Sequence, residues 1–214
     1  MPLGDSDTNK TYLSISFGKL RKKVNEATPG AVSRINKIKE TVWELVYGFI
    51  TGKITNILYK EHSEYGNSFE ITFDDGNEKY NVSLPEDSKY CQDFLSRLPN
   101  LDLSHYVTLS PYDFKPQDSE KNKKGLTLKQ NGVKIENYFV TKEDDKYIFS
   151  HGYPETDGQL SKADWKIYVI RLQEFLKKFT IETIIPKLTE TKFESQSEAT
   201  PSQGDNDSDD DLPF

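Results

Sequence analysis

Basic side chains gather near the start of this 214-residue sequence. Seven Lys and Arg residues occur from Lys19 to Lys39, and Glu26 is the only acid in that interval. A second basic group occupies the polar stretch 115–124. Such clusters neutralise phosphates, and the affinity that they give falls as the salt concentration rises. The predicted phosphate contacts are Arg21, Lys22, Lys23, Arg34, Lys37, Lys53, Lys121, Lys123 and Lys124.

Aromatic residues are plentiful, with 12 Phe, 12 Tyr and 2 Trp. Their rings can stack on the bases of a single strand, and each stack contributes about 1–3 kcal/mol. An aromatic residue on a strand usually belongs to the core, and we expect this of Phe49, Phe69 and Phe73. Tyr and Trp tolerate partial exposure because their polar end stays hydrated. The predicted stacking residues are therefore Trp43, Tyr47, Tyr80 and Tyr112.

Alternating apolar residues predict the strands that position these side chains. A short strand is expected within 11–20, and the basic segment after it forms a loop or hairpin around Pro29–Gly30. Residues 41–60 predict one long strand, interrupted by two glycines that mark bends. Residues 67–84 predict two strands around a tight turn at Asp75–Gly76.

A helix and two more strands complete this region. The helix is expected over 86–98, with Asp87 or Ser88 as its N-terminal cap. A strand follows in 105–114, and Asn131–Gly132 predicts a β-hairpin. The order of three strands, a helix and two strands is typical of the OB-fold, a five-stranded Greek-key barrel.

The predicted fold class is mainly β with added helices. We expect an OB-fold-like five-stranded barrel with an extra β-hairpin extension, a C-terminal helix and a disordered acidic tail. Residues 141–160 lack a regular pattern, whereas 160–179 predict a helix that packs on the barrel or forms a dimer, which leaves a homo-oligomer open. The expected organisation is a flexible N-terminus in 1–10, the barrel domain in 11–140, a helical extension in 141–189 and the tail in 190–214.

The end of the chain differs in composition from the rest. From Glu194 to Phe214 there are seven acids and no base, whereas the preceding residues carry 28 of each sign. This segment has too few apolar residues to form a core. Its ending, DSDDDLPF, combines acids with an apolar ring, which a partner with an apolar pocket and a basic rim would hold. The predicted partner-binding residues are Asp209, Asp210, Asp211, Leu212, Pro213 and Phe214.

The DDDLPF ending resembles the DDDIPF ending of bacterial single-stranded-DNA-binding proteins, with Leu212 in place of isoleucine. The basic segment and the extra helix have no counterpart there, so the chain looks more like a divergent phage-encoded version. The resemblance implies that 11–140 binds and protects single-stranded DNA, with little sequence preference, during replication, recombination or repair. It also implies that the tail recruits a polymerase, helicase, primase or nuclease.

The sequence also bears on other classes of protein. The sequence has no P-loop, G-x-S-x-G, H-E-x-x-H or Rossmann glycine pattern, so we expect neither an enzyme nor a catalytic residue. One cysteine and three widely separated histidines predict no metal site and no cofactor. An OB-fold adaptor that binds only proteins, or an RNA-binding protein, would fit the same pattern. The lack of a long apolar run predicts no membrane partner and a cytoplasmic location.

Overall fold

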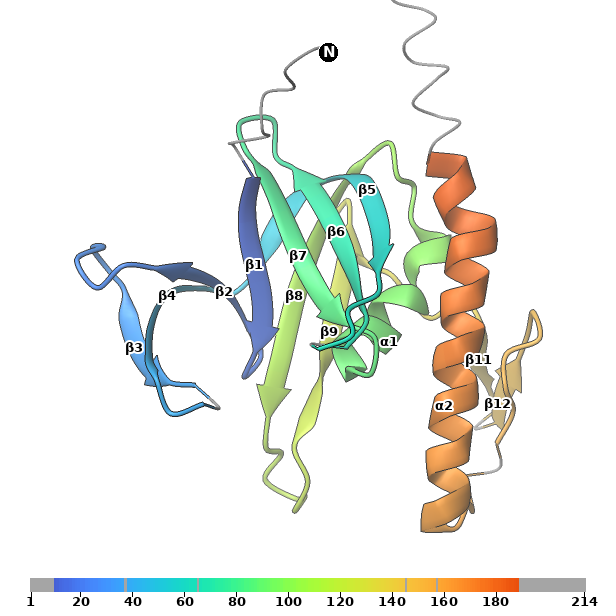
Figure 1. The fold of residues 1–214 in the computed structure, drawn as a ribbon. Helices are drawn as coiled ribbons and strands as arrows, with labels where there is room; N and C mark the ends of the chain where they lie inside the picture. Colours follow the sequence, from blue (N-terminus) through green and yellow to red (C-terminus); the bar gives the residue numbers. More distant parts are fainter. Residues whose placement is uncertain (1–9, 37, 65, 145, 157, 189–214) are drawn as a thin grey trace, which may run out of the picture.

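A computed structural model describes residues 10–36, 38–64, 66–144, 146–156 and 158–188 (Figure 1). Ten strands form one sheet in the order β10-β9-β8-β5-β6-β7-β1-β2-β4-β3, and β11 pairs with β12 in a separate hairpin. The two α-helices are α1 (Lys89–Leu95) and α2 (Lys162–Phe179). The strands are β1 (Lys10–Ser16), β2 (Lys19–Val24), β3 (Val32–Ile35), β4 (Thr41–Tyr47), β5 (Ile50–Lys60), β6 (Ser68–Asp74), β7 (Lys79–Pro85), β8 (Tyr106–Phe114), β9 (Lys123–Gln130), β10 (Val133–Lys134), β11 (Val140–Glu143) and β12 (Lys146–Phe149).

The hydrophobic core lies on one face of the central strands, because alternate residues of a strand point to the same side. On β6, Phe69, Ile71 and Phe73 are completely shielded from solvent. Val82 and Leu84 continue this buried surface on the neighbouring strand β7. The prediction that Phe69 and Phe73 belong to the core is confirmed.

The sheet curls, but no strand pairing closes it. Strand β1 adds in parallel to β7, and the turn after β1 packs on β8, where Gly18 lies against the backbone of Asp113. Gly18 has a φ of +66°, and a Cβ there would overlap this backbone, so glycine alone fits. Within the described residues β2 pairs with β1 and β4, not with β8. The predicted five-stranded barrel is therefore wrong: the N-terminal strands extend the sheet, and the fold is a mainly β, ten-stranded open sheet with two helices.

The long strand predicted over 41–60 is two strands, because the chain leaves the core at Gly48. Strand β5 belongs to the central sheet, whereas β4 pairs with β2 on one side and β3 on the other. These three strands form an arm that projects from the side of the sheet (Figure 1). The predicted basic hairpin thus supplies the outer strands of the arm. Gly52 does not break β5; its backbone lies against β6, and a Cβ there would come within 2.9 Å of the Asp74 carbonyl oxygen.

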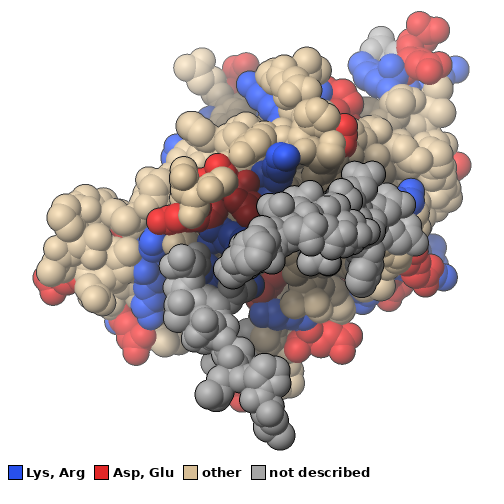
Figure 2. All heavy atoms as spheres, turned by 90° about the horizontal axis from the view of Figure 1, so that it is seen from above, with Lys and Arg blue, Asp and Glu red and all other residues tan. Residues whose placement is uncertain are grey.

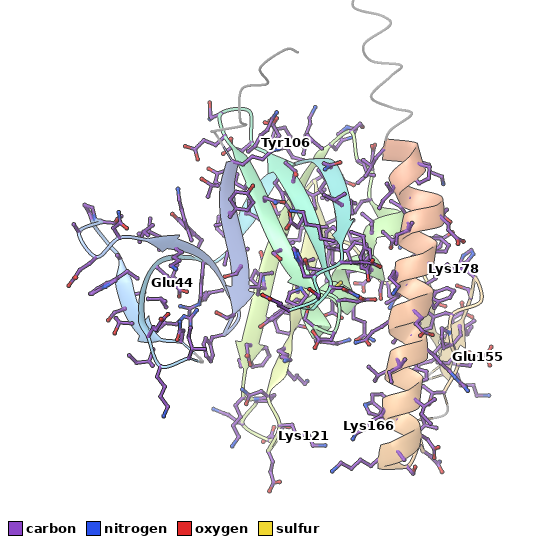
Figure 3. The ribbon with its side chains drawn as sticks, in the orientation of Figure 1. Glu44, Tyr106, Lys121, Glu155, Lys166 and Lys178 are labelled. Carbon is purple, nitrogen blue, oxygen red and sulfur yellow. The ribbon has the colours of Figure 1, made fainter. Side chains whose placement is uncertain are left out.

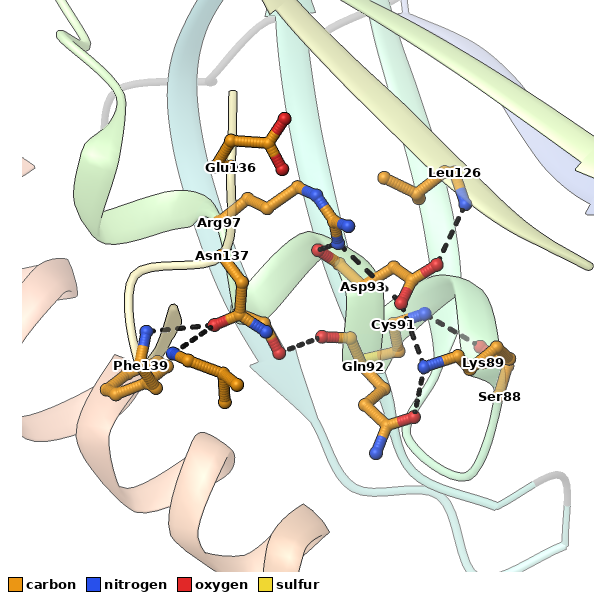
Figure 4. A network of polar contacts seen from close by, with 12 residues as sticks. Ser88, Lys89, Cys91, Gln92, Asp93, Arg97, Leu126, Glu136, Asn137 and Phe139 are labelled. Carbon is orange, nitrogen blue, oxygen red and sulfur yellow. Dashed lines mark hydrogen bonds and ion pairs between the residues drawn. The ribbon is translucent and has the colours of Figure 1, made fainter. Parts of the chain in front are cut away.

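Helix α1 covers the edge of β9 (Figure 4). It is shorter than predicted, and Ser88 caps it by accepting a hydrogen bond from the Cys91 N–H, one of the two caps expected. The buried carboxylate of Asp93 accepts a hydrogen bond from the Leu126 N–H at 3.2 Å and lies 3.0 Å from Lys89 Nζ. Asp93 therefore takes the place of a neighbouring strand and protects the edge from further pairing.

Replacing Gly125 by alanine should destabilise the fold by about 1–3 kcal/mol, the usual cost of overpacking a tight site. A Cβ at Gly125 would overlap the Asp93 carboxylate and would lie 2.7 Å from the Tyr112 hydroxyl. Thermal unfolding followed by circular dichroism measures the change. The matched control is Gly48→Ala, since the closest atom to a Cβ there is Lys19 Nζ at 4.0 Å. Equal melting temperatures for the two variants would contradict the expectation.

Helix α2 packs through one apolar stripe, as its periodicity predicts. Leu172 and Leu176 are buried, and Lys177 Nζ lies 3.0 Å from a Glu86 carboxylate oxygen at the end of β7. Ser161 caps the start of the helix, with its Oγ accepting a hydrogen bond from the Asp164 N–H. None of the helices in the described part of the chain is long and apolar enough to span a lipid bilayer.

The prediction that 141–160 is irregular is wrong in its first half, where β11 and β12 form a hairpin. Asp144 adopts a φ of +44° in the turn between them, a conformation that Asp tolerates better than most residues. Beside the hairpin, Phe139 is fully buried against the rings of Phe175 and Phe179 on α2. This aromatic packing fixes α2 to the rest of the fold.

Candidate nucleic-acid interface

A cleft of about 240 Å³ is lined by β1, β2, the junction between β4 and β5, and the turn between β6 and β7 with the start of β7. Strand β1 contributes Thr11 and Leu13, and β2 contributes Leu20 and Lys22. Tyr47 and Tyr80 are the cross-strand neighbours of Leu20 and Thr11, on β4 and β7. The other lining residues come from the start of β5 and its junction with β4 and from the turn between β6 and β7: Phe49, Ile50, Thr51, Asp75 and Glu78.

Three aromatic rings meet in this cleft. Tyr47 is 42% exposed and Phe49 is 64% exposed, whereas Tyr80 is half-buried. The cleft thus brings together the predicted residues Tyr47 and Tyr80 from strands that are not paired with each other. Phe49 was expected in the core, and that prediction is wrong because Phe49 follows Gly48 at the point where the chain passes between two strands.

The two sides of the cleft carry opposite charges. Lys22 Nζ donates a hydrogen bond to Thr11 Oγ1 at 3.1 Å on one side. Asp75 and Glu78 lie on the other, and hydrogen bonds from the Glu78 and Asn77 N–H groups hold the pKa of Asp75 below its usual value. Burial, followed by the charges of these two acids, raises the pKa of Tyr80 to about 12, so its hydroxyl remains a donor at neutral pH. The cleft can therefore attract a phosphate to Lys22 and accept hydrogen bonds from base amino groups on its acidic side.

Arg21 and Arg34 are predicted phosphate contacts, but the structure joins both to one acid on the arm (Figure 3). Arg34 donates from Nε and Nη2 to the two carboxylate oxygens of Glu44 at 2.8 and 2.7 Å. Arg21 Nη1 donates to Glu44 Oε2 at 2.8 Å. Glu44 is 4% exposed, and its hydrogen bond from Arg34 is the largest cause that lowers its pKa. These three residues, the Glu44 triad, retain one net positive charge for a phosphate.

The turn between β1 and β2 presents a ring that the sequence reasoning did not select. Phe17 is 69% exposed, and the Arg21 guanidinium lies over it at 5.5 Å from the ring centre. Because Gly18 packs on Asp113, Phe17 lies at the same end of the sheet as the exposed Phe114, which pairs with Lys123. Phe17 and Arg21 therefore lie near the loop between β8 and β9, whereas Lys22, the next residue of β2, points to the opposite face and lines the cleft. Phe17 and Gly18 both adopt a positive φ in this turn, and Gly18 was the signal in the sequence for a turn at this point.

The remaining predicted residues lie elsewhere. Lys23, Lys121, Lys123 and Lys124 are exposed, and Lys121 stands at the tip of the β8–β9 loop, away from the cleft (Figure 3). Trp43 is half-buried on the same side of β4 as Tyr47, and Lys53 lies 5.8 Å from the ring centre of Tyr106, an exposed residue that was not predicted. Tyr112 does not line the cleft, and its hydroxyl lies at Gly125 beside the buried Asp93. Lys37 and the six predicted tail residues, Asp209 to Phe214, are outside the described residues.

Comparisons with known proteins do not extend this description. No family model, no curated protein and no solved structure matches the chain. In the part of the chain that the structure describes, no three His, Cys, Asp or Glu side chains are grouped so that they could hold a metal ion.

Proposed function

We propose that the protein binds and protects single-stranded DNA with little sequence preference during replication, recombination or repair. The observation that carries this proposal is the convergence of Tyr47, Phe49 and Tyr80 with Lys22 in one cleft. Every base has a flat face, so stacking on these rings would hold a strand without reading its sequence. The bases of a duplex are already stacked on one another, and a cleft of this kind would therefore discriminate against double strands.

The charge distribution supports a narrow track for the strand rather than a broad basic face. Acidic and basic side chains alternate on the face seen in Figure 2, and no large area of one sign is visible there. Lys22 lies in the cleft with the three rings, whereas Arg21 lies over Phe17 on the opposite face of β2, toward Lys123 and the β8–β9 loop. A flexible single strand would place its nucleobases on the cleft rings and a phosphate at Lys22, and basic residues near the β8–β9 loop would contact phosphates further along the strand.

The second half of the proposal concerns the residues that follow the described chain. Asp209, Asp210 and Asp211 would meet a basic rim on a partner enzyme, and Leu212, Pro213 and Phe214 would enter an apolar pocket. The partner is a polymerase, helicase, primase or nuclease that acts on the same DNA. The contact is small, so we propose that it is weak and exchanges rapidly.

Fluorescence anisotropy with a labelled thymidine oligonucleotide tests DNA binding. The full chain should bind the single strand well above a duplex of the same length, and the affinity should fall as salt is raised. An RNA oligonucleotide in parallel distinguishes an RNA-binding protein. Absence of binding to every nucleic acid would contradict the proposal and favour an adaptor that binds only proteins.

The loop lysines give a quantitative prediction. Exchanging Lys121 and Lys123 for alanine should reduce the slope of log Kobs against log salt by about 1.4, the value for two phosphate contacts of a single strand. Affinity for oligonucleotides of different sequence should fall by the same factor. The matched control replaces Lys146 and Lys178, which are also exposed but lie on β12 and α2. Identical salt slopes for the two double variants would exclude the loop from the path of the strand.

A further inference from the structure

A groove of about 430 Å³ runs between α1 and α2, on the other side of the molecule from the arm (Figure 1). Its wall on α2 is formed by Trp165, Tyr168, Val169 and Leu172. Trp165 is 49% exposed and packs against the Tyr168 ring at 5.4 Å between ring centres. A half-exposed indole beside a groove is a surface on which an apolar side chain can bind.

Lysines surround this groove. Lys89 and Lys124 line it, and Asp87 is the one acid among its lining residues. Lys162 lies about two helical turns before Val169, and Lys166 lies about two turns before Gln173. The two lysines therefore lie on the same face of α2 as these groove residues. Figure 3 shows Lys166 on the side of α2 that faces the β8–β9 loop, where Lys121 is also labelled. The groove therefore combines an apolar floor with a basic rim.

We propose that this groove binds the C-terminal residues 207–214 of the same chain. Leu212 and Phe214 would pack on Trp165, and the acids that precede them would lie along the lysines. The charges are complementary, because Asp207, Asp209, Asp210 and Asp211 have no base among them. The bound segment would be withheld from partner enzymes until one of them displaces it.

The length of the chain permits this contact. Leu188 is 23 residues beyond Trp165 in a continuous helical segment, which corresponds to about 35 Å. Residues 189–206 can span up to about 60 Å when extended, so the end of the chain can return along α2 to the groove. A tether of this length gives an effective concentration in the millimolar range, which suffices for a weak contact.

The groove suits this segment better than the cleft proposed for DNA does. The groove offers the apolar end of the segment an indole and offers its acids four nearby lysines, Lys89, Lys124, Lys162 and Lys166, whereas Lys22 is the one base among the residues that line the cleft. The proposal is also independent of DNA binding, because its test contains no nucleic acid.

Quenching of Trp165 fluorescence by acrylamide tests the contact in the full chain. Trp43→Phe removes the other tryptophan and leaves Trp165 as the reporter. Adding Leu212→Ala and Phe214→Ala should raise the quenching constant by about twofold, because a segment bound more than half of the time would no longer cover the indole. Lys162→Glu with Lys166→Glu should have the same effect, whereas Lys178→Glu, on another side of α2, should have none.

Dilution identifies the source of the bound segment. A contact within one chain is unchanged by roughly a hundredfold dilution, whereas a contact with the tail of a second copy is lost. Three results would overturn the proposal: equal quenching with and without Leu212 and Phe214, no effect of reversing the two lysines, or protection of Trp165 that disappears on dilution.

Discussion

Exchanging both Tyr47 and Phe49 for alanine is expected to weaken single-stranded DNA binding by about 30- to 1,000-fold, or about 2–4 kcal/mol. Each ring is substantially exposed in the cleft, so each can cover the face of one base. Exposed side chains contribute little to the core, and the melting temperature should therefore remain close to that of the unchanged protein. Anisotropy titrations with a thymidine oligonucleotide measure the loss.

Two further variants separate stacking from loss of apolar surface. Tyr47→Trp keeps a flat ring and should retain most of the affinity. Tyr147→Ala removes a tyrosine that is 65% exposed on β12, in the hairpin that is separate from the ten-stranded sheet, and should leave binding unchanged. If the double alanine variant bound DNA as tightly as Tyr147→Ala does, the cleft would not be the site of the stacked bases.

The aromatic residues show which side-chain positions strand periodicity can predict and which it cannot. Alternation places Phe69 and Phe73 on the inner face of one strand, and the register of β6 with β5 and β7 keeps them there. The same alternation predicts that Phe49 faces inward when 41–60 forms one strand. Gly48 ends that strand, and the direction of a side chain after a break depends on which neighbour the chain pairs with next. That pairing is a tertiary property, so no local pattern could assign Phe49 to the cleft.

The arginines show that the composition of a segment does not predict which charged side chains pair in the fold. The interval from Lys19 to Lys39 contains almost no acid, and this made Arg21 and Arg34 candidates for phosphate contacts. Glu44 lies outside the interval on β4, but the pairing of β4 with β2 and β3 places it between the two arginines. A count along the chain does not include partners from across a sheet. The same reason applies to Tyr112, whose hydroxyl is directed to the helix-covered edge of β9.

Several local predictions hold because their cause is local. The Asn131–Gly132 turn has positive φ at both residues, as a tight hairpin requires, and it joins β9 to β10. The cap at Ser88 depends on a side chain and a backbone N–H three residues apart. The overall topology could not be obtained in this way, because the parallel addition of β1 to β7 joins segments about 70 residues apart.

Replacing Glu44 by alanine is expected to loosen the arm by about 2 kcal/mol. This loss of stability is larger than that from breaking an exposed ion pair and smaller than that from breaking a fully buried one. Glu44 is intermediate because the two guanidinium groups themselves shield much of its carboxylate from solvent. Without Glu44, Arg21 and Arg34 would repel each other. Hydrogen exchange measured by mass spectrometry should show faster exchange in β2, β3 and β4, while β6 and β7 remain protected.

The matched control for this change is Glu26→Ala, which removes an exposed acid from the turn between β2 and β3 without breaking a described ion pair. If the control accelerated exchange in the arm as much as Glu44→Ala, net charge and not the Glu44 triad would explain the effect. Binding provides a second readout, because both arginines become free for phosphates. A loss of DNA affinity in Glu44→Ala would mean that DNA binding requires the intact shape of the arm. A gain in affinity would mean that the two released arginines contact phosphates.

Acidification should remove the same contribution in the unchanged protein. The pKa of Glu44 is lower in the folded arm than in the unfolded chain, chiefly because Arg34 donates hydrogen bonds to its carboxylate. A lowered pKa stabilises the folded arm fully above the unfolded value of about 4.3, and this contribution disappears as the pH falls through the folded value. The difference in arm protection between the unchanged protein and Glu44→Ala should therefore be constant from about pH 6 to 8 and should shrink below about pH 4. A difference that stayed the same at pH 3 would mean that the ionised carboxylate does not hold the two arginines together.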